Sequence, residues 1–146
     1  MSAEKLDLSI IIPILNEEEN LVPLVEEITT CLGGMKYEII FIDDGSDDDS
    51  IKVIKQLKKT YERIRIIKHR RNFGKAVALK TGFASAKGKV SITMDGDLQD
   101  DPAEIPRFLE EIKQGNDIVC GWREKRQDNI FKRWPSKVYN SLVRFM

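Results

Sequence analysis

Short apolar runs rich in β-branched residues recur along the chain. They occupy residues 8–14, 37–42, 64–68, 90–94 and 117–120. Runs of this length, bounded by polar or glycine-containing segments, are typical of buried strands. The pattern therefore predicts five strands, of which the last is the shortest.

The segments between these runs carry apolar residues at the spacing of an amphipathic helix. Gly115 is expected to end the fourth helix, and Pro102 is compatible with its first turn. Ser46 or Asp47 is expected to cap the second helix. The expected apolar stripes are Leu21, Leu24, Val25, Ile28 and Leu32; Ile51, Ile54, Leu57 and Tyr61; Ala76, Leu79, Phe83 and Ala86; and Ile105, Phe108, Leu109 and Ile112.

The alternation of strands and helices predicts the α/β class, with a mainly parallel sheet and helices on both of its faces. In such sheets, ligands bind outside the carboxyl ends of the strands. Acidic residues follow the first, second and fourth runs, whereas basic residues and a Gly-Trp-Arg segment follow the third and fifth. These segments are therefore the first places to search for a site.

The segment after the fourth run is the most informative. Asp95 and Asp97 lie one residue apart directly after a predicted strand, so both carboxylates are expected to face the same opening. Hard divalent cations such as Mg²⁺ and Mn²⁺ prefer oxygen ligands and often share them with substrate phosphates. Gln99 is placed to add an amide oxygen, and Asp100 and Asp101 are expected to form a cap before Pro102.

Acids also follow the first and second runs. No Gly-x-Gly-x-x-Gly segment and no P-loop lysine motif is present, and glutamates repel phosphate, so a phosphorylated ligand here requires a bridging metal. Asp43 and Asp44 are compatible either with a turn and helix cap or with hydrogen bonds to a base and a ribose. Glu18 and Glu19 are expected to interact with the dipole of the first helix, whereas Glu17 is a site candidate.

The third run ends in basic residues. Lys75 begins the third predicted helix and is either a solvated residue or a partner for a diphosphate. Arg70 and Arg71 are expected to contribute general surface basicity. His69 is the only histidine, so no Cys/His cluster is available for zinc.

Composition narrows the function classes. The chain of 146 residues contains 24 basic and 24 acidic residues, and a formal net charge of zero gives no pull toward nucleic acid. Cys31 and Cys120 are expected to be reduced core residues, which suits a cytosolic compartment. No apolar stretch approaches the roughly 20 residues that a membrane-spanning helix requires, and no signal peptide is expected.

Four motifs now become recognisable together. They are SIIIPILNEEEN at 9–20, IDDGSDD at 42–48, NFGKAVALKTG at 72–82 and MDGDLQDDP at 94–102. In this order they resemble family 2 glycosyltransferases with the Rossmann-like GT-A fold. The closest similarity is to the polyisoprenyl-phosphate branch, which includes dolichyl-phosphate mannose synthases and bacterial undecaprenyl-phosphate sugar transferases. The resemblance covers residues 8 to about 140.

The resemblance implies an inverting, metal-dependent transfer of a sugar from a UDP- or GDP-sugar to a polyprenyl or dolichyl phosphate, in cell-envelope or glycan biosynthesis. A phosphate acceptor is already ionised at neutral pH, so the reaction needs positioning and charge stabilisation and no strong base. The implied donor residues are Pro13, Leu15 and Glu17 in the nucleotide pocket, Asp43 and Asp44 at the base and ribose, Lys75 and Asp95 at the diphosphate, and Asp95, Asp97 and Gln99 on Mg²⁺ or Mn²⁺.

The segment after residue 121 is expected to begin the acceptor side, with residues 1–121 forming the donor part. The lipid phosphate is expected to meet Arg123, Lys132, Arg133 and Ser136, because guanidinium forks match phosphate oxygens. A plain exposed basic loop is the alternative. With Asp97, the residues Arg133 and Ser136 complete the implied catalytic set.

The chain is expected to be a piece of a longer, membrane-anchored parent at the cytoplasmic face of a membrane. The piece itself is expected to be soluble and its own activity is in doubt, and a homo-oligomer is possible. One alternative is a non-catalytic nucleotide-sugar-binding module. A phosphorelay receiver is disfavoured because the third run ends in bases and the fifth in Gly-Trp-Arg.

Overall fold

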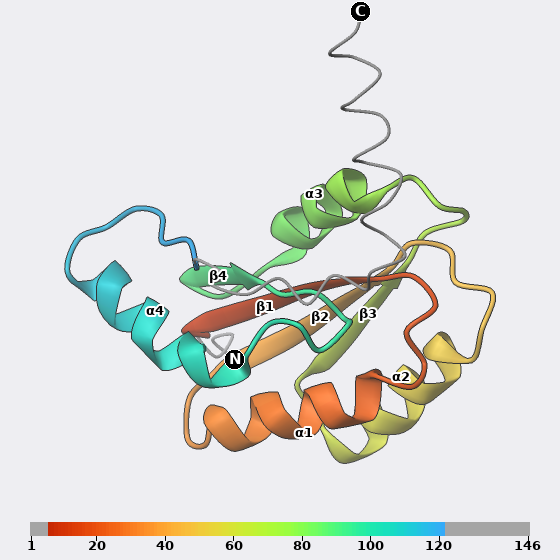
Figure 1. The fold of residues 1–146 in the computed structure, drawn as a ribbon, viewed down its shortest axis with the longest axis horizontal. Coiled ribbons are helices and arrows are strands. Elements are labelled where there is room, and N and C mark those ends of the chain that lie inside the picture. The colour runs from red at the N-terminus through yellow and green to blue at the C-terminus, as the bar shows by residue number, and fades with distance from the viewer. Residues whose placement is uncertain (1–5, 122–146) are drawn as a thin grey trace, which may run out of the picture. The chain divides into compact units, whose positions relative to one another are not determined.

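The computed structural model describes residues 6–121 and contains a four-stranded sheet in which all neighbouring strands are parallel (Figure 1). The strands are β1 (Leu8–Ile14), β2 (Tyr37–Asp43), β3 (Ile64–Lys68) and β4 (Val90–Thr93). Their order is β3-β2-β1-β4, which is the order of a Rossmann-type half sheet extended by the fourth strand. A phosphorelay receiver has a different order, 2-1-3-4-5, so the topology excludes that alternative.

Among residues 6–121, four helices and one 3₁₀ turn connect and cover the sheet. They are α1 (Leu21–Cys31), α2 (Ser50–Thr60), α3 (Lys75–Ser85), the 3₁₀ turn η1 (Pro102–Glu104) and α4 (Ile105–Lys113). Figure 1 shows α1 and α2 on one face of the sheet and α3 on the other. The predicted α/β class with helices on both faces is therefore confirmed.

The central strand β1 is buried on both faces, as expected for an inner strand of a parallel sheet. Its alternate residues Leu8, Ile10 and Ile12 pack into a large core with residues of α1, α2 and α4. Ile11 points to the other face and packs in a smaller core with Ile40, Ile42 and Ala78. The stripe predicted for α1 is fully buried, at Leu21, Leu24, Val25, Ile28 and Leu32.

Helix α3 buries only part of the face predicted for it, because Leu79 and Ala86 are half-buried against the smaller core whereas Ala76 and Phe83 are exposed. Its buried residues are Ala78 and Gly82, whereas Phe83 is 52% exposed. A Cβ at Gly82 would lie 2.3 Å from Cγ2 of Ile11, so the helix approaches the sheet too closely for any larger residue. The prediction missed Ala78 and Gly82 because it was based on large apolar side chains, whereas the close approach of this helix to the sheet requires the smallest residues.

The predicted strand at 117–120 is not formed. Within the described residues, the sheet has no strand beyond β4, and Ile118 is 81% exposed. A short apolar run becomes a strand only when a neighbouring strand satisfies its backbone, and none does so among residues 6–121. Cys120 is consequently exposed, which corrects its assignment to the core. No helix among residues 6–121 is long and apolar enough to cross a bilayer.

The start of α2 also differs from the prediction. The helix begins at Ser50, whose N–H donates to the Asp48 carboxylate at 3.0 Å. Ser46 and Asp47 are instead bound to Asn16: the Asn16 N–H donates to Ser46 Oγ, and the Asp47 N–H donates to Asn16 Oδ1, both at 3.0 Å. The prediction took the first residues able to cap the helix and missed Asn16, which follows β1 and binds both of them.

Candidate functional site

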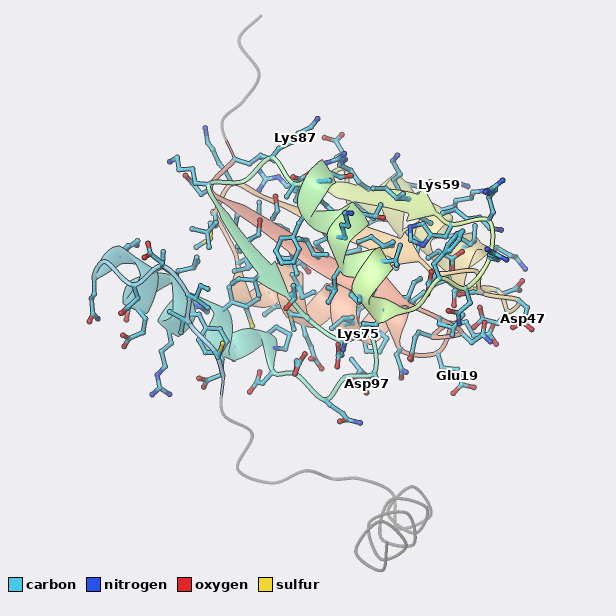
Figure 2. All side chains as sticks on the ribbon, turned by 90° about the horizontal axis from the view of Figure 1, so that it is seen from above. Glu19, Asp47, Lys59, Lys75, Lys87 and Asp97 are labelled. Atoms are coloured by element: carbon cyan, nitrogen blue, oxygen red, sulfur yellow. The ribbon has the colours of Figure 1, made fainter. Side chains whose placement is uncertain are left out.

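A cavity of about 300 Å³ opens at the carboxyl ends of β1, β2 and β4. It lies beside the ends of the neighbouring strands β1 and β4, where the strand order reverses, and this is the position at which open α/β sheets bind ligands. Figure 2 shows Lys75 and Asp97 close together at this edge. The lining residues are Pro13, Ile14, Leu15, Glu17, Asp44, Asn72, Gly74, Lys75, Asp95, Gly96 and Asp97.

The cavity brings together most of the predicted donor residues. Pro13, Leu15, Glu17, Asp44, Lys75, Asp95 and Asp97 all line it, while Asp43 and Gln99 do not. The predicted acceptor residues lie beyond the described residues; they are Arg123, Lys132, Arg133 and Ser136. Their roles stay predictions.

The turn after β1 forms one wall. The Asp44 N–H donates to the Ile14 carbonyl at 2.9 Å, and the Glu17 N–H donates to Ser50 Oγ at 3.0 Å, so the ends of β1 and β2 are tied together. Asn16 adopts a φ of 59°, a left-handed conformation that asparagine tolerates. Leu15 is left exposed at the rim of the cavity.

The glutamates that follow Glu17 act differently from the prediction. Helix α1 begins at Leu21 and has no acid in its first turn. Glu18 instead accepts a 2.7 Å hydrogen bond from the Asp49 N–H, just ahead of α2. Its charge therefore lies near the amino end of α2, a position that a negative charge stabilises.

The turn after β2 is locked against the segment that precedes α3. Gly45 has a φ of +89°, and a Cβ there would lie 2.7 Å from the backbone of both Arg71 and Asn72. Only glycine satisfies both the conformation and the close approach. This contact fixes the position of Asn72, which lines the cavity.

Asp44 uses its carboxylate to hold that neighbouring segment. Its Oδ1 accepts hydrogen bonds from Nδ1 of His69 at 2.8 Å and from the Phe73 N–H at 3.0 Å. Its Oδ2 accepts from the Gly74 N–H at 2.7 Å. Burial alone would raise the pKa of Asp44, but these hydrogen bonds outweigh it and lower the pKa below its usual value.

Asp43 is completely buried, and unlike Asp44 it has a hydrogen-bond partner at only one of its two carboxylate oxygens. Its Oδ1 accepts a hydrogen bond from the Ser46 N–H at 3.1 Å. Its Oδ2 is the single buried side-chain polar atom in residues 6–121 that lacks a hydrogen-bond partner. An unsatisfied buried carboxylate oxygen is costly, so this atom is a candidate partner for a bound ligand or an ordered water.

The turn after β4 carries the predicted metal ligands. Gly96 is buried, and a Cβ there would lie 3.1 Å from Cγ2 of Ile14, so this turn packs against the end of β1. Asp97 Oδ1 accepts a hydrogen bond from the Gln99 N–H at 3.2 Å. Between these two residues Leu98 has a φ of 60°, which is unfavourable for leucine. Strained backbone of this kind is concentrated at functional sites.

These residues suit a hard divalent cation that is shared with a substrate. Within the described part of the chain, no three His, Cys, Asp or Glu side chains converge as a metal-binding group. Asp95 and Asp97 supply two carboxylates at the cavity, and Mg²⁺ typically takes one or two carboxylates plus phosphate oxygens and waters. The Lys75 ammonium contacts Asp95 Oδ1, so one cationic side chain already lies at these carboxylates. The donor set therefore fits Mg²⁺ or Mn²⁺.

Sequence reasoning missed several lining residues. Asn72 and Gly74 belong to the segment before α3, and Gly96 separates the two aspartates. Gly74 has a φ of +92°, so an Asn-Phe-Gly segment ahead of a helix was the available signal for a tight, conformationally specific turn.

Asp101 was assigned correctly as a cap, because its Oδ1 accepts a hydrogen bond from the Ala103 N–H at 2.9 Å and caps η1. Asp100 is no cap and accepts from the Asp95 N–H at 2.8 Å.

Comparison with known proteins identifies the family. The sequence matches the family described as Glycosyl transferase family 2 over residues 9–146. It is 37% identical over 145 residues to the dodecaprenyl-phosphate galacturonate synthase of Rhizobium johnstonii, covering 96% of this chain and 43% of that protein. It is 39% identical over 138 residues to the undecaprenyl-phosphate 4-deoxy-4-formamido-L-arabinose transferase of Pseudomonas fluorescens, covering 92% and 40% respectively. The chain thus spans about two-fifths of the length of these relatives.

Solved structures share the fold. The mannosyltransferase PcManGT from Pyrobaculum calidifontis, in complex with GDP-Man and Mn²⁺, matches with a TM-score of 0.58 and 22% identity over 62% of this chain and 27% of its own. S. aureus TarS 1–349 matches with a TM-score of 0.63 and 16% identity over 75% of this chain and 33% of its own. The expected GT-A fold is confirmed, and the chain belongs to glycosyl transferase family 2.

Proposed function

We propose that this chain forms the donor part of an inverting glycosyltransferase that moves a sugar from a UDP- or GDP-sugar to a polyprenyl phosphate. The observation that carries the proposal is the convergence of Asp95, Asp97 and Lys75 at one cavity, in a chain 37% and 39% identical to two polyprenyl-phosphate sugar transferases. Nucleotide sugars, a lipid phosphate and a membrane surface are therefore its proposed partners.

The cavity supplies complementary charges for a nucleotide diphosphate. Asp95 and Asp97 would hold Mg²⁺ or Mn²⁺ against the diphosphate, with Gln99 as a further oxygen donor. The metal would neutralise charge that develops on the departing nucleotide diphosphate. Lys75 lies beside Asp95 and would bring its ammonium to the same diphosphate.

The nucleoside would occupy the side of the cavity formed by β1 and β2. Pro13, Leu15 and Glu17 lie along that wall. Asp43 does not line the cavity, so its unpaired Oδ2 would accept a hydrogen bond from the base or the ribose only when the nucleoside enters more deeply than the cavity extends in this structure. Asp44 lines the same wall but already accepts three protein hydrogen bonds, which suits a supporting role.

The acceptor step would use residues of the following segment. An oxygen of the lipid phosphate would attack the anomeric carbon from the face opposite the nucleotide, and the bond to the nucleotide diphosphate would break. Arg133 and Ser136 would position that phosphate, with Arg123 and Lys132 adding positive charge. The phosphate would already be ionised, so no general base would be required.

Calorimetric titration tests the donor site directly. The chain is titrated with UDP and with GDP, each with and without Mn²⁺, alongside Asp97→Asn. Binding of one nucleotide that requires Mn²⁺ and weakens at least about tenfold in the variant supports the proposal. Asp47→Asn is the matched control, because Asp47 is an exposed carboxylate outside the cavity and is expected to leave binding unchanged.

Transfer is tested separately. Incubation with a radiolabelled nucleotide sugar and undecaprenyl phosphate is expected to place the label in the lipid fraction if the acceptor elements are complete. Metal-dependent binding without transfer favours a nucleotide-sugar-binding module for this chain. Absence of any nucleotide binding by the folded wild-type chain contradicts the proposed donor site.

A further inference from the structure

His69 follows β3 and is the only histidine in the chain. Its side chain is 11% exposed, and it does not line the cavity. The proposed donor chemistry gives it no task. Its hydrogen bonds nevertheless connect three elements that surround the cavity, which makes it the strongest candidate for a further role.

Both ring nitrogens of His69 are engaged. Nδ1 lies 2.8 Å from Asp44 Oδ1, and Nε2 lies 3.0 Å from Thr81 Oγ1 on α3. An ionised carboxylate only accepts hydrogen bonds, so Nδ1 carries the hydrogen that joins it to Asp44. The ring also contacts Phe73 edge to face, with centroids 5.5 Å apart. The orientation of the imidazole is therefore set from three directions.

Asp44 passes this constraint to the cavity. The same carboxylate accepts hydrogen bonds from the Phe73 and Gly74 N–H groups, at 3.0 and 2.7 Å. Gly74 lines the cavity and directly precedes Lys75, the first residue of α3. The direction in which Asp44 points therefore fixes the backbone from which the Lys75 side chain reaches Asp95.

We propose that His69 is a positioning residue of the donor site: through Asp44 it holds the wall formed by Phe73, Gly74 and Lys75 in the geometry that receives a nucleotide diphosphate. Without the Nδ1 donor, the Asp44 carboxylate loses one of its three hydrogen bonds, and only the Phe73 and Gly74 N–H groups then oppose its rotation toward the cavity. A negative charge turned inward would repel a diphosphate. This inference rests on the proposed donor function.

Two amide side chains separate the two ring nitrogens. Asparagine places its amide nitrogen near the position of Nδ1, whereas glutamine places its own near Nε2. His69→Asn therefore keeps a donor for Asp44, whereas His69→Gln keeps a polar group near Thr81 and loses the donor for Asp44. Both variants lose the aromatic ring, so any general effect of lost packing is shared. Thr81→Val removes the other hydrogen bond while keeping the side-chain shape.

The first readout uses the nucleotide-free chain. Hydrogen exchange at the Gly74 N–H is expected to accelerate about tenfold in His69→Gln, the effect of losing one hydrogen bond to a charged group, and less than about threefold in His69→Asn and Thr81→Val. The second readout is the affinity for UDP or GDP with Mn²⁺. It is expected to weaken about tenfold in His69→Gln alone.

Equal behaviour of the asparagine and glutamine variants in both readouts would overturn the proposal, because it would leave only the volume of the ring. Faster Gly74 exchange with unchanged affinity would also overturn it. If the wild-type chain binds no nucleotide, the proposed function fails, while the Gly74 exchange still decides whether His69 holds this wall.

A spectrum of the wild-type chain provides a test that needs no variant. With a single histidine, a long-range ¹H–¹⁵N correlation contains one imidazole pattern. We expect Nδ1 to give the shift of a protonated nitrogen at neutral pH. An Nδ1 shift typical of an unprotonated nitrogen would contradict the hydrogen bond to Asp44 and with it the proposal.

Discussion

The two ends of β2 both bury carboxylates, but they treat them in opposite ways. Near the amino end, Glu38 accepts hydrogen bonds at Oε1 from Ser9 Oγ and the Lys87 N–H, both at 2.7 Å. Its Oε2 accepts one from Nη1 of Arg65 at 2.6 Å, so both oxygens are satisfied by the protein. At the carboxyl end, Asp43 keeps one buried oxygen without a partner among the described residues.

This difference teaches where the molecule is built for stability and where for binding. The Glu38 network joins β1, β2, β3 and the segment before β4, and its groups need nothing from outside. The carboxyl end instead places Asp95 and Asp97 at the cavity and leaves one buried side-chain oxygen, Oδ2 of Asp43, without a partner among the described residues, and it is there that we propose a ligand binds. Figure 2 shows Lys87 and Asp97 far apart on the molecule.

The largest expected effect comes from two glycines, one near each end of the sheet. A Cβ at Gly88 would lie 2.5 Å from the backbone of Leu8 and Ser9, and one at Gly45 would lie 2.7 Å from that of Arg71. Each change to alanine is expected to destabilise the fold by about 3 kcal/mol in urea unfolding, because backbone cannot yield as a flexible side chain does. Only Gly45→Ala should also weaken nucleotide binding by the folded protein. Equal binding by both variants would contradict the division.

The next effect compares amides at Glu38 and Asp43. Glu38→Gln weakens a satisfied buried network and is expected to destabilise the fold by about 2 kcal/mol in urea unfolding, with nucleotide affinity unchanged. In this variant a carboxamide nitrogen replaces an oxygen that accepted hydrogen bonds, and it therefore faces donor groups without being able to accept from them. A loss of nucleotide affinity by the folded variant would show that the amino end also serves the site.

Asp43→Asn is expected to give the reverse result. One oxygen remains to accept the Ser46 N–H, and the costly buried charge is removed, so stability should change by less than about 0.5 kcal/mol or increase. Nucleotide affinity, measured by calorimetry with Mn²⁺, should fall about tenfold. A destabilisation as large as that of Glu38→Gln would mean that Asp43 is structural.

The smallest expected effect is on the loss of stability at acidic pH. Burial alone would raise the pKa of Glu38, but hydrogen bonds from Arg65, Ser9 and the Lys87 N–H outweigh it and lower the pKa below its ordinary value of 4.5. A carboxyl whose pKa is lower in the folded state stabilises the fold above that ordinary value, and the contribution is lost as the pH falls through the folded value. Urea midpoints measured downward from pH 5 should therefore fall less steeply in Glu38→Gln than in the wild type. Parallel curves would remove Glu38 from the account of acid stability.

The sequence alone predicted the features that depend on local pattern. The four strands that form, the parallel α/β class and the placing of Asp95 and Asp97 at a strand end all follow from short stretches of chain. The strand expected at 117–120 failed because a strand also needs a neighbour, which no local pattern reveals.

The supporting contacts of the site were beyond reach for the same reason. Asp44 and His69 are 25 positions apart, and Asn16 competes for Ser46 across 30. The prediction missed the contact of Gly82 on α3 with the sheet, because this contact depends on the lack of a side chain at that position. The charged residues that line the cavity were thus predictable from motifs, whereas Asn72, Gly74 and the residues that hold the site together depend on which loops become neighbours.

The most direct test of the division between the two ends is the position of the metal. Mn²⁺ is paramagnetic and broadens nearby amide signals, so ¹H–¹⁵N spectra are recorded with Mn²⁺ and the nucleotide that binds. We expect the Gly74 and Gly96 signals to broaden strongly and the Gly88 signal to stay sharp. Broadening centred on the acidic segment 47–49, or at Gly88, would contradict a metal-dependent donor site at the carboxyl end of the sheet.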